Sequence, residues 1–354
     1  MAYTIEQPEC RDARDEVLAL WKRNLERATR QRYEWLYESG PAQEWIVRDE
    51  SNTAVGSMGM MGRTMKVFDE IRPVGQPIDL NVDKQHRLGG PAMQLQRSLT
   101  EAVDNGHIVL AYGLPNAQAE PVLRRVGYKV LGTMGRWTRP LRVDNLLSRR
   151  LNNPFLRKAT AGAINTGLWL SARETRCRRR KGVRSEVVDR FDERFDRLWL
   201  AARDKYAIIG ERNSEYLQWR FAQCPDVRYR TLCLCDDRDR LLAYLTYSQS
   251  EGRSYVGDML FADNRDLELL LAEFIWELRR HRNTAVTMIF YGDPFIANTL
   301  RKFGFYHRQS QWKVMIYPNR DELANAAASD DRDASFARAT QKENWFITRA
   351  DIDT

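Results

Sequence analysis

The chain has 354 residues, with 56 lysines and arginines against 48 acids and a formal charge of +8. This length predicts about two domains, and a 43% hydrophobic content with ten tryptophans excludes a disordered chain. No segment approaches the ~20 apolar residues of a transmembrane helix, and the N-terminus carries acids where a secretory signal needs a basic and then an apolar run. We therefore expect a cytoplasmic protein. Five scattered cysteines without CxxC spacing predict free thiols and no metal site.

The predicted elements of the first 142 residues alternate between strands and helices. Apolar residues at helical spacing indicate helices, and short apolar runs bounded by turn residues indicate strands. In chain order we expect a helix over 17–28, strands over 44–48, 54–61 and 77–82, a helix from residue 92, a strand over 107–112, a helix over 116–126 and strands over 128–141. This order predicts a mixed α/β fold with helices packed around a central sheet.

Three short matches occur in the same order in both halves of the chain, which indicates an internal duplication. They pair residues 112–115 (YGLP) with 291–294 (YGDP) at an offset of 179, residues 123–128 (LRRVGY) with 300–305 (LRKFGF) at 177, and residues 35–37 (WLY) with 219–221 (WRF) at 184. We place the two copies at residues 1–142 and 185–320. Asp258, Tyr291 and Asp293 could shape a substrate pocket between the copies, or the second copy could be a purely structural partner domain.

The basic charge is concentrated between the copies. Residues 142–184 contain twelve basic residues and two acids, a net of +10, which leaves −2 for the rest of the chain. The linker, residues 143–184, also has an apolar face. It could lie on an anionic membrane surface, meet a polyanion such as RNA or an acidic glycan, or pack across the two copies. The residues of the apolar face are Phe155, Leu156, Ala159, Ala163, Ile164 and Trp169.

The tail, residues 321–354, differs in composition from the two copies. It begins with an alanine- and aspartate-rich stretch that we expect to be mobile. It ends in an aromatic segment over residues 344–351, which we expect to dock onto the body of the protein.

The most informative segment runs from Ile78 to Ala92, where a strand leads through a basic, glycine-rich turn into a helix. Backbone N–H groups of such a turn can point at one anion, and the helix N-terminus adds partial positive charge. The turn is not a Walker A loop and lacks GxGxxG, and Gly89-Gly90 could simply form a tight turn. The equivalent segment of the second half, residues 262–269, has no glycine and three acids before Leu269. Because the turn can be made without glycines, we expect those of the first half to serve a diphosphate site.

Two motifs resemble those of the GCN5-related N-acetyltransferases. Arg87-x-x-Gly90-x-Ala92 resembles the family's R/Q-x-x-G-x-G/A signature and stands at the expected strand–helix junction. Asn116, followed by a helix and then Gly127-Tyr128, resembles the second cofactor-side motif. The resemblance covers most of residues 1–142 and, more weakly, 185–320. It implies two tandem acyl-CoA N-acyltransferase folds, of which the first keeps the acyl-CoA loop and the second is degenerate.

The resemblance also implies a cofactor and a set of site residues. Acetyl-CoA or another acyl-CoA would be the donor, and a substrate amine would attack its thioester directly while a general base takes the proton. The implied cofactor residues are Leu88, Gly89, Gly90 and Ala92 for the diphosphate, with Arg87 nearby, Leu80, Asn81 and Val82 for the pantetheine arm, and Asn116 near the far end of that arm.

The sequence departs from the family at the general acid. A tyrosine often precedes the Gly-aromatic pair by four residues, but Leu123 occupies that position here. Tyr112 and Tyr128 are possible substitutes, or they are core residues. The candidate bases are Asp79 and Asp83, then Asp69 and Glu70, each of which could instead be a solvated surface charge.

Three functions follow from these observations. The first is an acyl-CoA-dependent N-acyltransferase acting on a small-molecule amine or an amino sugar. The second is a Fem-type aminoacyl-tRNA-dependent transferase, which the basic linker favours and the CoA-type loop disfavours, so we do not expect a nucleic-acid partner. The third is a non-enzymatic binding or scaffold protein with a vestigial CoA site, which the missing tyrosine favours.

Overall fold

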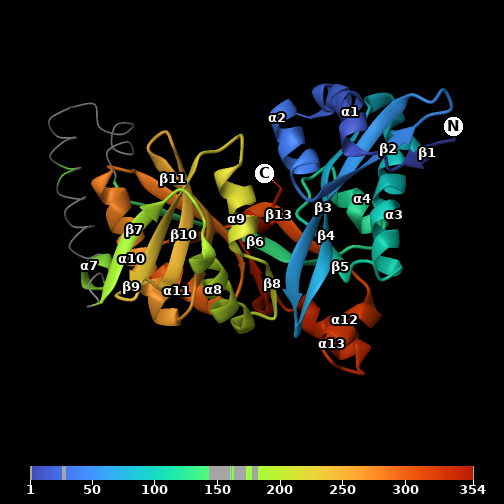
Figure 1. The fold of residues 1–354 in the computed structure, drawn as a ribbon. Helices are drawn as coiled ribbons and strands as arrows, with labels where there is room; N and C mark the ends of the chain where they lie inside the picture. Colours follow the sequence, from blue (N-terminus) through green and yellow to red (C-terminus); the bar gives the residue numbers. More distant parts are fainter. Residues whose placement is uncertain are drawn as a thin grey trace.

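A computed structural model describes residues 2–25, 29–142, 160, 162, 173–177 and 182–353. The chain forms two lobes, and the C-terminus lies between them (Figure 1). The six apolar residues named above for the linker lie outside the described residues. Within the described part, no helix combines the length and hydrophobicity needed to cross a membrane.

The first copy follows the predicted order of elements, and the mixed α/β class is confirmed. The helix expected from residue 116 begins only at residue 120, because Asn116 forms a turn before it. The elements are β1 (Thr4–Glu6), α1 (Cys10–Asn24), α2 (Arg30–Tyr33), the π-helical turn η1 (Glu34–Glu38), β2 (Ala42–Arg48), β3 (Ala54–Val67), β4 (Glu70–Val82), the 3-10 turn η2 (Lys84–Gly89), α3 (Pro91–Asp104), β5 (Leu110–Gly113), α4 (Glu120–Arg125) and β6 (Lys129–Pro140).

The second half of the chain begins with α7 in the linker, and the second copy then repeats this plan. The elements of this half are α7 (Glu174–Cys177), β7 (Val183–Val188), α8 (Glu193–Ala202), η3 (Arg203–Lys205), β8 (Ile208–Gly210), α9 (Ser214–Leu217), the π-helical turn η4 (Gln218–Ala222), β9 (Tyr229–Asp236), β10 (Leu241–Ser250), β11 (Arg253–Phe261), α10 (Asn264–Arg280), β12 (Ala285–Gly292), α11 (Pro294–Lys302) and β13 (Tyr306–Pro318). In α7, the buried Glu174 accepts hydrogen bonds from Arg139 and Arg279, which fixes this part of the linker to the lobe.

The tail is ordered into α12 (Arg320–Ala326), α13 (Arg332–Thr340), η5 (Lys342–Asn344), β14 (Trp345–Ile347) and η6 (Arg349–Asp351). The stretch expected to be mobile thus forms two helices, which pack against each other and begin with side-chain caps from Asn319 and Asp331. Trp345 and Phe346 at the aromatic end are fully buried.

The two lobes share one sheet because they exchange their last strands. The strand order is β1-β2-β3-β4-β5-β13-β6-β12-β11-β10-β9-β7. Strand β13 of the second copy pairs with β5 of the first, and β6 of the first copy pairs with β12 of the second. The two exchanged strands pair with each other in the middle. The spatial units therefore do not follow the sequence boundary near residue 142.

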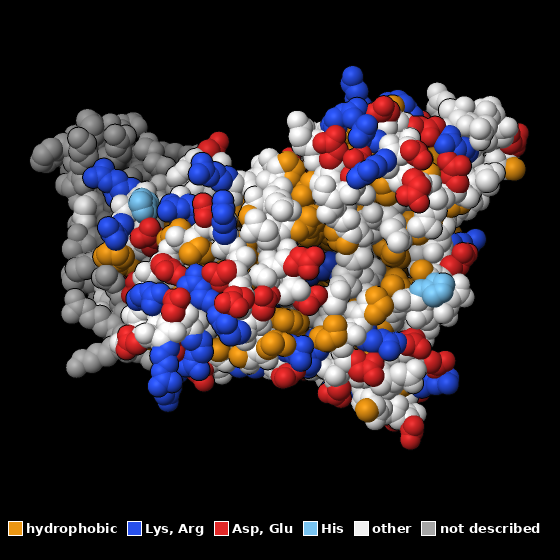
Figure 2. Space-filling model, in the orientation of Figure 1, with side chains coloured by type: hydrophobic (Ala, Val, Ile, Leu, Met, Phe, Trp, Pro, Cys, Tyr) orange, Lys and Arg blue, Asp and Glu red, His pale blue; other side chains and the backbone are white. Residues whose placement is uncertain are grey.

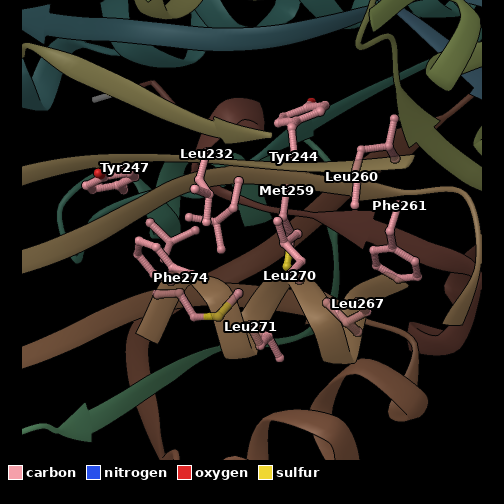
Figure 3. Close-up of a cluster of buried hydrophobic side chains, with 14 of the residues drawn as sticks. Leu232, Tyr244, Tyr247, Met259, Leu260, Phe261, Leu267, Leu270, Leu271 and Phe274 are labelled. Atoms are coloured by element: carbon pink, nitrogen blue, oxygen red, sulfur yellow. The ribbon is translucent and has the colours of Figure 1, made fainter. Parts of the chain in front are cut away.

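Helices cover both faces of the sheet in the first lobe. Almost every residue of β3 is buried, because α1 packs on one face and α3 on the other. The second lobe has a larger core, in which α10 packs against β9, β10 and β11 (Figure 3). Its apolar residues Leu267, Leu270, Leu271 and Phe274 recur at helical spacing and point at the strands.

The equivalent tryptophans of the two copies meet at the lobe contact. Trp35 in η1 and Trp219 in η4 stack with ring centroids 5.0 Å apart. Each indole Nε1 donates to the backbone carbonyl of the other residue, at 3.0 and 3.1 Å. The same contact made reciprocally by the two residues is what a two-fold relation between two copies predicts.

Candidate active site

In the first copy, the neighbouring parallel strands β4 and β5 pair at one point only, and we call the unpaired stretch beyond it the opening. The single pair joins Gly75 and Ala111. Farther along β4, the register on β3 shifts between the Ser57–Asn81 and Gly59–Ile78 pairs, which marks a bulge. Beyond Gly75, the edge of β4 that faces β5 is left without strand pairing in the described part of the chain.

Two residues define the bulge. Asp79 adopts a positive φ of 51°, which is uncommon for a residue other than glycine. The side-chain Nδ2 of Asn81 donates to the Asp79 carbonyl at 2.9 Å and to Ser57 Oγ at 2.9 Å. Of the residues predicted for the pantetheine arm, Leu80 is half-buried, whereas Asn81 and Val82 are buried and pair with β3. The predicted arm-binding strand thus lies beside the opening.

Asp79 is surrounded by groups from four elements. Arg32 Nη2 from α2 lies 3.1 Å from Asp79 Oδ1 and 2.5 Å from Asp353 Oδ1 in the tail. The hydroxyl of Tyr37 from η1 donates to Asp79 Oδ2 at 3.1 Å. Burial and the Asp353 carboxylate raise the pKa of Asp79 to about 6, although Arg32 opposes the shift. A carboxylate with such a pKa can accept a proton near neutral pH.

A second buried acid lies next to this group. Glu44 in β2 is fully buried, and burial together with the Asp79 carboxylate raises its pKa well above the usual range. Both effects disfavour the charged form of Glu44. The sequence did not single out Arg32, Tyr37, Glu44 or Asp353 as site residues. A weak signal was available only for Tyr37, in the repeat match of residues 35–37 with 219–221.

Asp83 has a different environment from Asp79. Its carboxylate accepts from Arg23 Nε and Nη2 at 3.1 and 2.9 Å and from Asn24 Nδ2 at 2.7 Å. Burial acts to raise the pKa of Asp83, but these hydrogen bonds outweigh it and lower the pKa. Asp83 thus ties the end of α1 to the start of the loop, and this arrangement disfavours it as a base.

The remaining candidate tyrosines are buried in the protein, and the remaining candidate acids lie away from the opening. Tyr112 is buried and its hydroxyl donates to the carbonyl of Asp351 at 3.0 Å. Tyr128 is buried beside Tyr317, with ring centroids 5.6 Å apart. Asp69 and Glu70 lie at the β3–β4 hairpin, at the opposite end of β4 from Asp79.

The glycine-rich turn has the features of an anion site. Gly90 has a φ of 96° and a Cβ built there would meet no atom within 4 Å, so the space above the turn is open. Pro91 begins α3, and the first turn of this 14-residue helix contains no acid. Gly89 ends η2, and Ala92 packs at the edge of the core. The exposed Arg87 donates from Nε to the carbonyl of Val82 at 3.0 Å.

Two other predicted cofactor residues lie at the surface. The side chain of Leu88 is fully exposed at the tip of η2. Asn116 is exposed between β5 and α4, where its Oδ1 accepts from the backbone N–H groups of Gln118 and Ala119 at 3.0 and 2.9 Å. These bonds form a turn that sets the direction of the chain after β5.

In the second copy, the equivalent helix start is closed by acids. The carboxylate of Asp263 accepts from the backbone N–H of Arg265 at 2.9 Å and caps α10, and Asp266 lies in the first turn. A carboxylate thus takes the position that an anion would occupy at the N-terminus of α10.

The strand opening of the second copy is filled by the tail. Strand β14 pairs with β12 through Tyr291–Ile347 and Gly292–Phe346. Gly292 has a φ of 146°, and a Cβ there would collide with the carbonyl of Trp345. Asp293, predicted to shape a pocket with Tyr291, instead caps α11 by accepting from the Phe295 N–H at 2.7 Å.

Asp258, the repeat equivalent of Asp79, also contacts the tail. It is fully buried and accepts from Tyr244 and Thr348 hydroxyls, both at 2.6 Å. Arg212 approaches it at 3.4 Å. Burial raises the pKa of Asp258, but all its approaches are occupied by the protein itself. Of the two equivalent acids, only Asp79 has a partly exposed neighbour, Asp353, whose side chain is 23% exposed.

Outside the opening, one group of potential metal ligands occurs in the described residues. Glu186, Cys235 and Asp239 place ligand atoms within 4.8 Å of one another. Arg194 Nη1 contacts all three, at 2.8, 3.7 and 3.2 Å. A guanidinium therefore already occupies the centre of this group.

Comparisons with known proteins bear on the fold. No family model matches the chain, and no curated protein sequence matches it. Solved structures do match. A GCN5-related N-acetyltransferase from Anabaena variabilis has a TM-score of 0.66 at 13% identity, over 92% of this chain and 75% of that chain. A probable N-acyltransferase from Enterococcus faecalis has a TM-score of 0.63 at 11% identity, over 90% and 72%.

A third similar structure contains a bound ligand. Saccharomyces cerevisiae N-myristoyltransferase with bound myristoyl-CoA has a TM-score of 0.54 at 12% identity, over 89% of this chain and 78% of that chain. All three likenesses extend over most of both chains. The protein therefore has the fold of the GCN5-related N-acetyltransferases.

Proposed function

We propose that the protein transfers an acyl group from acyl-CoA to the amine of a small molecule or an amino sugar, using its N-terminal copy. The observation that supports this most strongly is the contrast between the copies. The first has an open glycine turn at the start of α3 and an open β4–β5 edge with Asp79 at its bulge. The second has a carboxylate cap at the corresponding helix and its own tail in the strand opening.

The open turn fits the diphosphate of CoA. Its anionic oxygens would meet backbone N–H groups of Leu88, Gly89, Gly90 and Ala92 at a helix N-terminus that holds no competing acid. Arg87 adds positive charge at the rim. The pantetheine arm would run along the free edge of β4 beside Leu80, Asn81 and Val82, towards Asp79.

The proposed chemistry is direct transfer. The amine nitrogen attacks the thioester carbonyl carbon, the C–S bond breaks, and CoA leaves as a thiolate. Asp79 takes the proton lost by the amine, because its raised pKa makes it a competent base near neutral pH. Leu123 is buried where the family often has a tyrosine, so the described residues provide no tyrosine acid for the leaving thiolate at that position.

Binding is tested by thermal stabilisation with acetyl-CoA, longer acyl-CoAs and tRNA. A ligand at 100 times its Kd stabilises the folded state by about 2.7 kcal/mol. We expect stabilisation by an acyl-CoA. Stabilisation by tRNA alone would favour a Fem-type transferase instead, and the absence of any CoA effect would exclude the proposed function. Stabilisation without thiol release from acetyl-CoA across a panel of primary amines would favour a scaffold with a vestigial site.

Gly90→Glu tests the assignment of the loop, and Gly252→Glu is its matched control. Both glycines have positive φ, at 96° and 70°, and at both a Cβ would meet no atom within 4 Å. Gly252 lies in the β10–β11 turn of the second copy. Each substitution adds the same charge at a glycine of positive φ. We expect only Gly90→Glu to abolish the stabilisation by acyl-CoA, and equal effects of both variants would refute the loop assignment.

A further inference from the structure

The last residues of the tail connect the equivalent acids of the two copies. Thr348 donates to Asp258 in the second copy, and Asp353, five residues later, binds Arg32 beside Asp79 in the first copy. Between them, Asp351 forms ion pairs with Arg63 and Arg212, and its carbonyl accepts from Gln76 at 3.1 Å. The end of the chain is thus held at a fixed position between the lobes, where Figure 1 shows the C-terminus.

The Arg32 guanidinium is shared between two carboxylates. Its Nη2 atom contacts Oδ1 of Asp79 and Oδ1 of Asp353. The side chain of Arg32 is 4% exposed and that of Asp79 is 9% exposed. Such burial strengthens the charge interactions between these groups. Because one cation faces two anions, Arg32 cannot fully neutralise Asp79 while Asp353 is bound.

Polar groups from four elements act on Asp79 or lie beside it. Arg32 comes from α2, Tyr37 from η1, Glu44 from β2 and Asp353 from the tail. Tyr37 donates to Asp79, and burial raises the pKa of Glu44, which disfavours its charged form. Asp353 therefore supplies the negative charge that competes with Asp79 for Arg32. Asp353 is also the more exposed of the two carboxylates, with 23% of its side chain exposed against 9% for Asp79. The space-filling view has a notch between the lobes whose visible surface is mainly hydrophobic or uncharged (Figure 2).

We propose that Asp353 is a positioning residue that keeps Asp79 able to accept a proton by drawing Arg32 away from it. The proposal rests on the proposed function, in which Asp79 is the base. Without Asp353, Arg32 would pair with Asp79 alone and stabilise its ionised form. The C-terminal tail would then be a working part of the site in the first copy.

Carboxyl titration tests this without any substrate. The full chain is labelled with 13C at the aspartate carboxyl carbon, and the Asp79 signal is identified by its absence in Asp79→Asn. We expect Asp353→Asn to lower the titration midpoint of Asp79 by about 1 pH unit, since a nearby like charge disfavours ionisation. Asp353→Glu should restore the wild-type midpoint. Asp330→Asn, an exposed neutralisation between α12 and α13, should leave it unchanged.

The same variants have a kinetic readout. In thiol release from acetyl-CoA with an amine found in the panel above, the acidic limb of the pH profile should move to lower pH in Asp353→Asn and remain in place in Asp330→Asn. An unchanged Asp79 midpoint in Asp353→Asn would overturn the proposal, even if acyl-CoA binds and acyl transfer occurs. A failure of acyl-CoA to bind would instead overturn the proposed function and leave the titration to decide the role of Asp353.

Discussion

Asp79 and Asp83 show how position in space separates two acids that look alike in the sequence. They lie four residues apart, and composition and strand pattern make both plausible bases. The two acids differ in the groups that surround each carboxylate. Arg23 and Asn24 hold Asp83 as a carboxylate, whereas burial raises the pKa of Asp79. These partners lie far away along the chain, so the local pattern identified the candidates and could not choose between them.

This contrast predicts unequal effects of removing each charge. Asp79→Asn should reduce the rate of acyl transfer by about 10²–10⁴-fold, the usual contribution of a general base, without preventing stabilisation by acyl-CoA. Asp83→Asn should keep the rate within a few-fold. Its half-exposed ion pair with Arg23 should cost no more than about 1 kcal/mol of stability. Thiol release measures the rate of acyl transfer by both variants. Equal losses of activity would contradict the assignment of the base.

The raised pKa of Asp79 also predicts a pH dependence of stability. Folding raises this pKa from 3.8 to about 6, so the folded state binds the proton more tightly. The resulting stabilisation is fully present below pH 3.8 and is lost as the pH rises through 6, on the order of 2–3 kcal/mol. The Asp79→Asn variant lacks this pH-dependent stabilisation. In urea unfolding between pH 4 and 7, the stability of the wild type should fall relative to the variant, and parallel curves would exclude a raised pKa.

At the scale of elements, the sequence predicted most strands but not their partners. The strand over 77–82 and the helix from residue 92 are present as β4 and α3. The exchange of β6 and β13 was not foreseen. The two strands are repeats of each other and carry similar patterns, so pairing within a copy and pairing between copies satisfy the same alternation of side chains. Only the three-dimensional contacts distinguish the two arrangements.

The aromatic end of the tail docks onto the body, as the sequence predicts. Trp345 is fully buried, and its indole Nε1 donates to the carbonyl of Ala339 at 2.8 Å. Trp345→Ala should therefore cost about 3–5 kcal/mol of unfolding free energy. Leu200→Ala, at a position 55% exposed on α8, should change it by less than about 0.5 kcal/mol. Urea unfolding measures the unfolding free energy of both variants. A loss in Trp345→Ala as small as that in Leu200→Ala would show that the tail is not docked in solution.

At the scale of the whole molecule, the exchange of strands makes the two copies inseparable. Residues 1–142 lack β13, the neighbour of β5, and residues 185–354 lack β6, the neighbour of β12. Each fragment expressed alone should fail to give the cooperative unfolding transition of the full chain, because its sheet ends at unpaired strands. Co-expression of both fragments should restore a folded complex. Circular dichroism during heating measures the unfolding transition of each sample. A stable isolated fragment would contradict the expectation.

The exchange also has a consequence for biosynthesis. β5 is complete when residue 113 has been made, but the strand that pairs with it begins at Tyr306, about 190 residues later. At ~5–20 residues per second, a ribosome needs about 10–40 s to produce that partner. During this interval the N-terminal sheet has an uncovered edge open to wrong partners in the crowded cell. A nascent chain of this kind should depend on holding chaperones more than a protein whose domains fold one after the other.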